Sequence, residues 1–255
     1  MSVSREKTRP AGSRPAPKTA RAPLYLLAGG RGEIRKRGSD PLLAAAIATA
    51  GKSRPSVAYV GAASGDNAAF RVFIGRLLTA AGAGEIVPVP LCGRRASPAK
   101  AVEVLRTADI VFVSGGDVEE GMRVLGETGM EPVLREVKKG GTPFFGVSAG
   151  SIMLARSWVR WSDPGDDASA EVFPCLGFAP VLCDTHGEDD GWSELKALLA
   201  LSPVGTTGYG IVSGTALVVQ PGGDVEARGG EVHVFTKRAR GVAQAASLFP
   251  SRKEE

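Results

Sequence analysis

The amino-acid sequence predicts an α/β fold: a mostly parallel sheet with helices on both faces, followed by antiparallel strands towards the C-terminus. Three observations predict it. Up to Gly150, short and almost wholly apolar runs alternate with helical patterns, as in a parallel sheet that is covered on both faces. Helix-start signals such as Asp40-Pro41 and Ser97-Pro98 open some of these helical patterns. Beyond Gly150, strand-like pieces follow with a single helix among them.

The elements follow from these patterns in chain order. Apolar runs predict strands at residues 24–28, 56–61, 86–91, 109–114 and 142–147. Helices are predicted between them at 40–50, 67–81, 97–107, 118–125 and 132–139. Later strands are predicted at 176–183, 204–207, 216–220 and 231–236, with a helix at 191–201 and a turn at Gly222-Gly223 between the last two strands. The simplest organisation is one domain over residues 22–250, with a polar tail at 251–255.

The positive charge of the chain is concentrated at its N-terminus. The 255 residues carry a net charge of +4. Residues 1–21 contain six basic residues and one acid, so the remainder has a net charge of −1. This segment is rich in Pro and Ser and has no apolar periodicity, which predicts a disordered basic tail. We therefore expect no nucleic-acid binding by the folded domain, and any such binding would come from the tail.

Composition also bounds the cellular setting and the cofactors. Three cysteines without a CxxC pair predict neither a disulfide framework nor a zinc site. Two histidines that share no helix face predict no metal site, and no organic cofactor is expected. The N-terminus lacks an apolar signal segment, and the longest nearly apolar stretch, 41–50, is about half of the ~20 residues that a membrane span needs. We expect a cytoplasmic protein with no membrane partner.

The strongest local motif is Gly146-Val147-Ser148-Ala149-Gly150, which matches the G-x-S-x-G nucleophile elbow. A predicted buried strand leads into it and a helical pattern leads out. Such a turn would hold the Ser148 hydroxyl exposed, with the amides of the new helix facing a developing oxyanion. The alternative is a plain strand–helix turn that uses Gly and Ser for their geometry.

A second glycine-rich loop, Gly115-Gly116-Asp117, follows the predicted strand at 109–114. Ligands of open α/β sheets bind in the crevice at the carboxyl ends of the strands, and both glycine loops would face that crevice. The alternative is a loop whose glycines only permit the turn.

A serine nucleophile needs a base, and the candidates are His186 and His233. His186 lies between a predicted strand end and a polar loop, although a surface-loop histidine would look the same. His233 alternates with strand residues and is interpreted as structural. Asp163 lies between Ser148 and His186 and could orient the imidazole, but the pattern alone does not choose it over its competitors Asp166, Asp167 and Glu171.

Taken in order, these motifs resemble the peptidase E and cyanophycinase-like family, the S51 serine peptidases, over roughly residues 23–237. The run from Gly208-Tyr209 to Leu217 also resembles a strand pair of that family. The resemblance implies a fold similar to class I glutamine amidotransferases. It further implies Ser148 as nucleophile, His186 as base, Asp163 as its orienting acid and the amides of Gly116 and Ala149 as the oxyanion hole. It implies no cofactor.

Two positions depart from the family pattern. Ser213 stands where family members often have an acid that serves the histidine, which favours Asp163 as the third member or leaves the histidine unsupported. No arginine follows His186; Glu188, Asp189 and Asp190 stand there instead. These acids would repel an aspartate side chain and could hold a substrate ammonium group. The expected substrate contacts are Gly115, Asp117, Glu188 and Asp189.

The resulting hypothesis is a serine peptidase or amidohydrolase that acts on small peptides or isopeptide-like amides through an acyl-enzyme on Ser148. Its expected class is a dipeptidase or exopeptidase. The alternative is a non-catalytic ligand-binding module on an amidotransferase-like fold. The C-terminal strands could form the interface of a homodimer.

Overall fold

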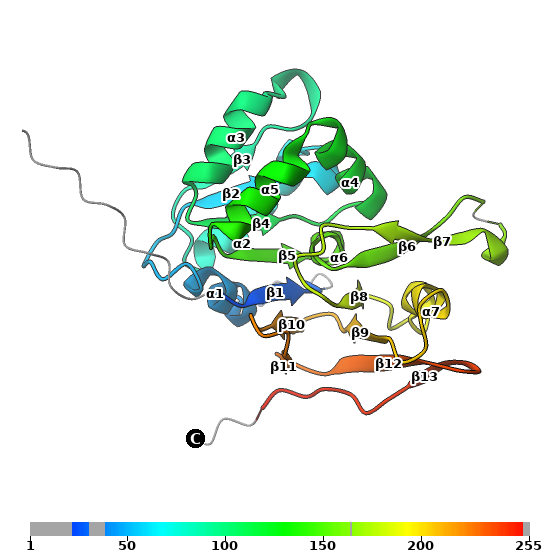
Figure 1. The fold of residues 1–255 in the computed structure, drawn as a ribbon. Coiled ribbons are helices and arrows are strands. Elements are labelled where there is room, and N and C mark those ends of the chain that lie inside the picture. The colour runs from blue at the N-terminus through cyan, green and yellow to red at the C-terminus, as the bar shows by residue number, and fades with distance from the viewer. Residues whose placement is uncertain (1–21, 31–38, 164, 252–255) are drawn as a thin grey trace, which may run out of the picture.

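A computed structural model describes residues 22–30, 39–163 and 165–251. Its centre is a seven-stranded sheet (Figure 1). In spatial order the strands are β11 (Val225–Arg228), β10 (Ala216–Val219), β1 (Leu24–Leu27), β5 (Phe144–Val147), β4 (Ile110–Val113), β2 (Val57–Val60) and β3 (Ile86–Val89). The five strands from β1 to β3 pair in parallel, whereas β10 and β11 add antiparallel pairs at one edge. The predicted fold class is confirmed.

Among the described residues, five helices flank this sheet, and the first four begin at a side-chain cap. They are α1 (Pro41–Ala48), α2 (Ala68–Ala80), α3 (Pro98–Thr107), α4 (Val118–Glu127) and α5 (Met130–Lys139). The side chains of Asp40, Asn67, Ser97 and Asp117 accept hydrogen bonds from backbone N–H groups of the first turns of α1 to α4. Each cap satisfies amides that have no partner within the helix.

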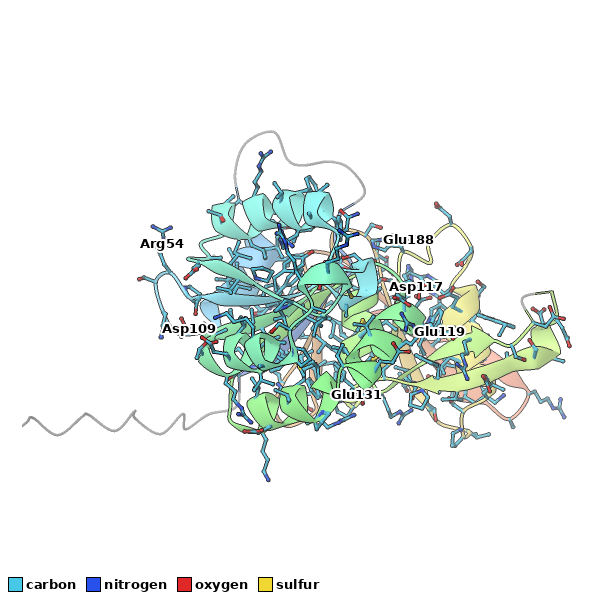
Figure 2. All side chains as sticks on the ribbon, turned by 90° about the horizontal axis from the view of Figure 1, so that it is seen from above. Arg54, Asp109, Asp117, Glu119, Glu131 and Glu188 are labelled. Atoms are coloured by element: carbon cyan, nitrogen blue, oxygen red, sulfur yellow. The ribbon has the colours of Figure 1, made fainter. Side chains whose placement is uncertain are left out.

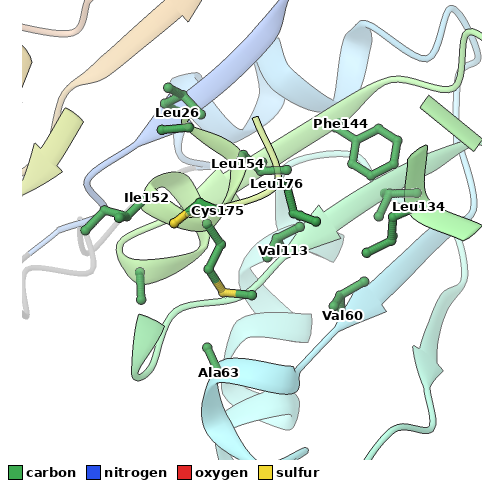
Figure 3. Close-up of a cluster of buried hydrophobic side chains, with 14 of the residues drawn as sticks. Leu26, Val60, Ala63, Val113, Leu134, Phe144, Ile152, Leu154, Cys175 and Leu176 are labelled. Atoms are coloured by element: carbon green, nitrogen blue, oxygen red, sulfur yellow. The ribbon is translucent and has the colours of Figure 1, made fainter. Parts of the chain in front are cut away.

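Alternating side chains of the central strands build two cores, one on each face of the sheet. One core packs beneath α3, α4 and α5, and Figure 3 shows part of it, including Leu26, Val60, Val113, Leu134 and Phe144. The other packs beneath α1 and α2 and includes Leu27, Tyr59, Phe112 and Phe145. Since large apolar side chains contribute roughly 1.5–3 kcal/mol each when fully buried, these cores hold the strand ends in fixed positions.

The C-terminal half adds a second sheet and a hairpin. The sheet has the order β13 (Gly241–Gln244), β12 (Val232–Arg238), β9 (Thr207–Ile211) and β8 (Leu182–Thr185). The hairpin consists of β6 (Ser157–Trp161) and β7 (Ala170–Pro174), and it projects from the body of the molecule beside α7 (Ser193–Ala200) (Figure 1). A third core, which includes Trp192, Leu195 and Phe235, joins α7 to this sheet.

The elements after Gly150 depart in part from the prediction. Residues 176–181 are irregular and only 182–185 form a strand, because Gly177 has a positive φ and Pro180 cannot donate to a ladder. The strand predicted at 204–207 is β9, which begins only at Thr207. Strands β6, β7, β11 and β13 were not predicted, and the turn at Gly222-Gly223 joins β10 to β11.

Some predictions fall on parts of the chain that the structure does not describe. The basic tail at 1–21 and residues 252–255 lie outside the described residues. Within the described ranges, no helix combines the length and the apolar character needed to cross a bilayer.

Candidate active site

Ser148 occupies a sharp turn between β5 and the short helix α6 (Ala149–Leu154). Its φ of 55° and ψ of −127° are unusual for a residue with a side chain, and its N–H donates to the Leu27 carbonyl at 2.9 Å. A conformation of this kind costs on the order of 1–3 kcal/mol and persists only where the surroundings enforce it. The strand–turn–helix context that the motif requires is therefore present around Ser148.

The two motif glycines allow the backbones around Ser148 to approach closely. A Cβ on Gly146 would lie 2.6 Å from the Gly150 carbonyl, and a Cβ on Gly150 would lie 2.1 Å from the Val113 carbonyl oxygen. Neither site has room for a side chain. Helix α6 can thus start directly against strands β4 and β5, which places Ser148 at their carboxyl ends.

The second glycine loop lies beside Ser148. A Cβ on Gly115 would be 3.2 Å from the Ser148 Cβ and 3.7 Å from its Oγ. Gly116 has a φ of 145°, and a Cβ there would lie 2.0 Å from the Ala63 carbonyl oxygen. The loop is held in this position because the Asp117 N–H donates to the same carbonyl at 2.8 Å. The two glycine loops therefore meet, as predicted.

Asp117 has a structural task in addition to its expected place near substrate. Its carboxylate accepts a hydrogen bond from the Glu120 N–H at 2.7 Å and so caps α4. Figure 2 shows Asp117, Glu119 and Glu188 towards the end of the molecule opposite to Arg54 and Asp109. This is the end where strand β4 has its carboxyl terminus, so the side chain lies on the side of the crevice.

His186 directly follows strand β8 and is half-buried, with a φ of 64°. Its ring Nδ1 lies 2.9 Å from the Ser213 Oγ. The Ser213 N–H in turn donates to Glu188 Oε1 at 2.6 Å. His186, Ser213 and Glu188 therefore form a connected hydrogen-bonded set, and the histidine is supported by the residue that stands in the acid's position.

The contact with Ser213 has a chemical consequence for the imidazole. When Nδ1 carries the proton it donates to the serine oxygen, and Nε2 is then left with a lone pair. That tautomer is the one a general base needs. A carboxylate only accepts and so fixes this tautomer, whereas the Ser213 hydroxyl can also donate to Nδ1 and brings no formal charge.

The structure does not give Asp163 the orienting position at Nδ1 of His186. Asp163 is exposed in the loop at the far end of the β6–β7 hairpin, where its Oδ1 accepts from the Gly165 N–H at 3.0 Å. Two of its competitors are also engaged locally. Asp166 accepts from the Ala168 N–H, and Glu171 pairs with Arg160. Sequence spacing does not reveal that residues 162–163 and 165–169 lie in the loop between β6 and β7.

Trp192 fixes the loop that follows His186. Its N–H donates to the Gly187 carbonyl at 2.8 Å, and its ring fills the space above two glycines. A Cβ on Gly187 would lie 2.6 Å from the ring, and one on Gly210 of β9 would lie 2.7 Å from it. The indole also lies 5.6 Å from the His233 ring, which agrees with the structural interpretation of that histidine.

A buried carboxyl and a half-buried one lie next to the site and were not predicted. Asp184 in β8 is 5% exposed, and burial, with a contribution from Glu194, raises its pKa from 3.8 to about 7. Burial likewise raises the pKa of Glu194, whose carboxylate accepts from the Trp158 Nε1 at 2.9 Å. The signal available in the sequence was an acid inside an otherwise apolar strand.

The remaining predicted contacts are placed as follows. Asp189 is exposed in the loop after His186. The amide of Ala149 is at the first position of α6, where a helix provides no acceptor, and the exposed Gly116 lies in the neighbouring loop. Among the described residues, no three His, Cys, Asp or Glu side chains are grouped so that they could hold a metal ion.

Comparisons with known proteins agree with this geometry. The model of peptidase family S51 matches residues 25–226. Peptidase E of Pasteurella multocida is 28% identical over 130 residues, which cover 48% of this chain and 55% of that protein. A pyridoxal 5'-phosphate synthase subunit PdxT of Anoxybacillus flavithermus is 25% identical over 54% of this chain and 67% of its own. The chain thus spans about half to two thirds of the length of these curated relatives.

Solved structures show the same fold. A peptidase from an acI-B1 actinobacterium superposes with a TM-score of 0.66 at 19% identity, over 90% of this chain and 97% of the other. A putative peptidase E of Listeria monocytogenes gives a TM-score of 0.55 at 15% identity, over 81% and 98%. The family model covers most of the chain and indicates a hydrolase of the peptidase type. The chain belongs to peptidase family S51.

Proposed function

We propose that the protein is a serine peptidase or amidohydrolase that acts on small peptides or isopeptide-like amides through an acyl-enzyme on Ser148. The observation that carries the proposal is the strained, glycine-framed turn that holds Ser148 beside Gly115 and Gly116. Membership of family S51 supports it. A merely structural strand–helix turn would not need a non-glycine residue at a φ of 55°.

The proposed reaction begins at Ser148. The Ser148 Oγ attacks the scissile carbonyl while Nε2 of His186 takes its proton, and the amides of Gly116 and Ala149 stabilise the oxyanion. The C–N bond then breaks as His186 returns the proton to the leaving amine. Water repeats the attack on the ester with His186 again as base, which frees Ser148. Ser213, in place of Asp163, keeps the proton on Nδ1.

The charges near the site favour a substrate with a cationic rather than an acidic end. Glu188 and Asp189 follow His186, and Asp117 lies in the second glycine loop. Glu188 and Asp117 also support the protein's own backbone. A peptide with a free ammonium group would meet negative potential here, whereas an aspartyl side chain would be repelled.

The test is amine release from a panel of dipeptides and short peptides by the wild type and Ser148→Ala. The wild type should release amine, and Ser148→Ala should lose at least about 10⁴-fold in kcat. A fluorophosphonate reagent should add once to the wild type, on Ser148, with loss of fluoride, and not at all to the variant. Full activity in a folded Ser148→Ala protein would contradict the role of Ser148.

A second candidate is a ligand-binding module without catalysis, and the neutral Ser213 in the acid's position favours it. This candidate predicts no turnover and no fluorophosphonate adduct in either protein. It also predicts that some amides of the panel raise the melting temperature of the wild type and of Ser148→Ala alike.

A further inference from the structure

Glu188 reaches back from the loop after His186 to the turn that carries Ser213. Its Oε1 accepts the Ser213 N–H at 2.6 Å, and the Ser213 Oγ lies 2.9 Å from Nδ1 of His186. We propose that Glu188 is a positioning residue for the hydrolysis: it holds Ser213 against His186 and supplies the negative charge that the Ser213 hydroxyl lacks. The inference rests on the proposed function of Ser148 and His186.

The turn around Ser213 is held at several points, and Glu188 is one of them. The Gly214 N–H donates to the Gly29 carbonyl at 2.7 Å, and Thr215 donates to the Val212 carbonyl through its N–H at 3.0 Å and its hydroxyl at 2.6 Å. These bonds fix the two sides of the turn. The hydrogen bond from the Ser213 N–H to Glu188 fixes Ser213 itself, so the Ser213 hydroxyl is already oriented towards the imidazole.

The electrostatic part of the proposal follows from the charge that develops during the reaction. His186 becomes an imidazolium when it takes the proton of Ser148, and a nearby negative charge stabilises that form. Ser213 is neutral. Glu188 Oε1 accepts a hydrogen bond from the Ser213 N–H, and the hydroxyl of the same serine contacts the imidazole. Ser213 is therefore the one residue between the charge of Glu188 and the ring of His186.

Other carboxyls near this loop have different engagements. Asp184 and Glu194 lie where β8 meets α7, and burial raises the pKa of both. Asp190 accepts from the Trp192 N–H at 2.8 Å and the Ser193 hydroxyl at 2.9 Å, at the start of α7. Asp189 is exposed. Glu188 is the acid that this structure connects to His186 through Ser213.

Glu188→Gln is the informative variant because it keeps an oxygen acceptor for the Ser213 N–H and removes the charge. We expect kcat to fall about tenfold, and KM to rise by a smaller factor because part of the negative potential that attracts the substrate ammonium group is lost. Loss of the negative charge disfavours the imidazolium, so the NMR titration midpoint of His186 and the acid limb of kcat/KM should move to lower pH, by roughly half to one pH unit. Ser213→Asp should restore kcat in the Glu188→Gln background, since it places a carboxylate directly on Nδ1.

The chain supplies its own controls. It contains two histidines, so the His233 signals report whether each variant remains folded. Glu231→Gln removes the carboxylate that lies 3.6 Å from His233 and should leave kcat and the His186 titration unchanged.

The outcomes separate the two proposals. An unchanged kcat and an unchanged His186 titration in Glu188→Gln would overturn the role of Glu188, while inactive Ser148→Ala would leave the proposed function standing. If the wild type hydrolyses nothing, the proposed function fails. In that case the His186 titration alone decides whether Glu188 acts on the imidazole.

Discussion

At the scale of single residues, contiguous motifs were predictable and long-range contacts were not. The G-x-S-x-G motif places Ser148 between a strand and a helix, because strand, turn and helix follow one another within a few residues. The partner of His186 depends on how the chain returns 27 residues later. Ser213 was counted as a missing acid, yet its hydroxyl makes the contact. Asp163 has a suitable charge and spacing but lies on a projecting hairpin.

The motif glycines provide a test of stability at this scale. In Gly150→Ala the new methyl group would lie 2.1 Å from the Val113 carbonyl oxygen, which is backbone and cannot turn away. We expect a loss of about 3 kcal/mol or more in the free energy of unfolding, measured by urea denaturation. In Gly222→Ala the nearest atom is 3.9 Å away, so stability should change by less than about 0.5 kcal/mol. Equal stability of the two variants would contradict the packing described for α6.

At the scale of elements, the accuracy of the prediction follows the strength of the local signals. Helices α1 and α3 begin directly after the predicted start signals at Asp40 and Ser97, because a side-chain cap acts within one turn. Strand β9 was placed too early because it contains Gly208 and Gly210, which are poor strand formers. Both glycines are needed there, since the side chains of α7 and Trp192 fill the space that a Cβ would occupy.

The junction of β8 with α7 has a pH dependence that follows from Asp184. The folded protein raises the pKa of Asp184 from 3.8 to about 7, chiefly by burial. Between these values the folded state holds a proton that the unfolded state has lost, so the contribution of Asp184 to stability falls as the pH rises from 4 to 7. Asp184→Asn carries no charge. Its free energy of unfolding should therefore exceed that of the wild type by about 4 kcal/mol at pH 8 and nearly equal it at pH 4.

Urea denaturation at pH 4 and pH 8 measures this difference. Asp224→Asn, which removes an exposed carboxylate from the turn after β10, is the matched control and should follow the wild type at both pH values. A wild type that is as stable as Asp184→Asn at pH 8 would show that the buried carboxyl carries no such cost.

At the scale of the whole molecule, the candidate site depends on the junction of two sheets. Ser148 and the glycine loop end strands of the central sheet, whereas His186 ends a strand of the C-terminal sheet. The chain passes from β9 in one sheet to β10 in the other through the turn that contains Ser213. Periodicity identified most of the strands, but it carries no information on which sheet each one joins. The contact of His186 with Ser213, and of Ser213 with Glu188, was therefore beyond the reach of sequence patterns.

The distribution of charge over residues 1–255 leads to a prediction about nucleic-acid binding. Residues 1–21 contribute +5 to a total of +4, so a chain that starts at residue 22 has a net charge of −1. Affinity for nucleic acid depends on the number of phosphates that basic groups neutralise. Whatever DNA binding the full chain shows at low salt should therefore be lost when residues 1–21 are deleted, while amine release stays unchanged. A filter-binding assay with duplex DNA at 50 to 200 mM salt measures the DNA affinity of both proteins. Tight DNA binding by the truncated protein at 150 mM salt would place a basic surface on the folded domain.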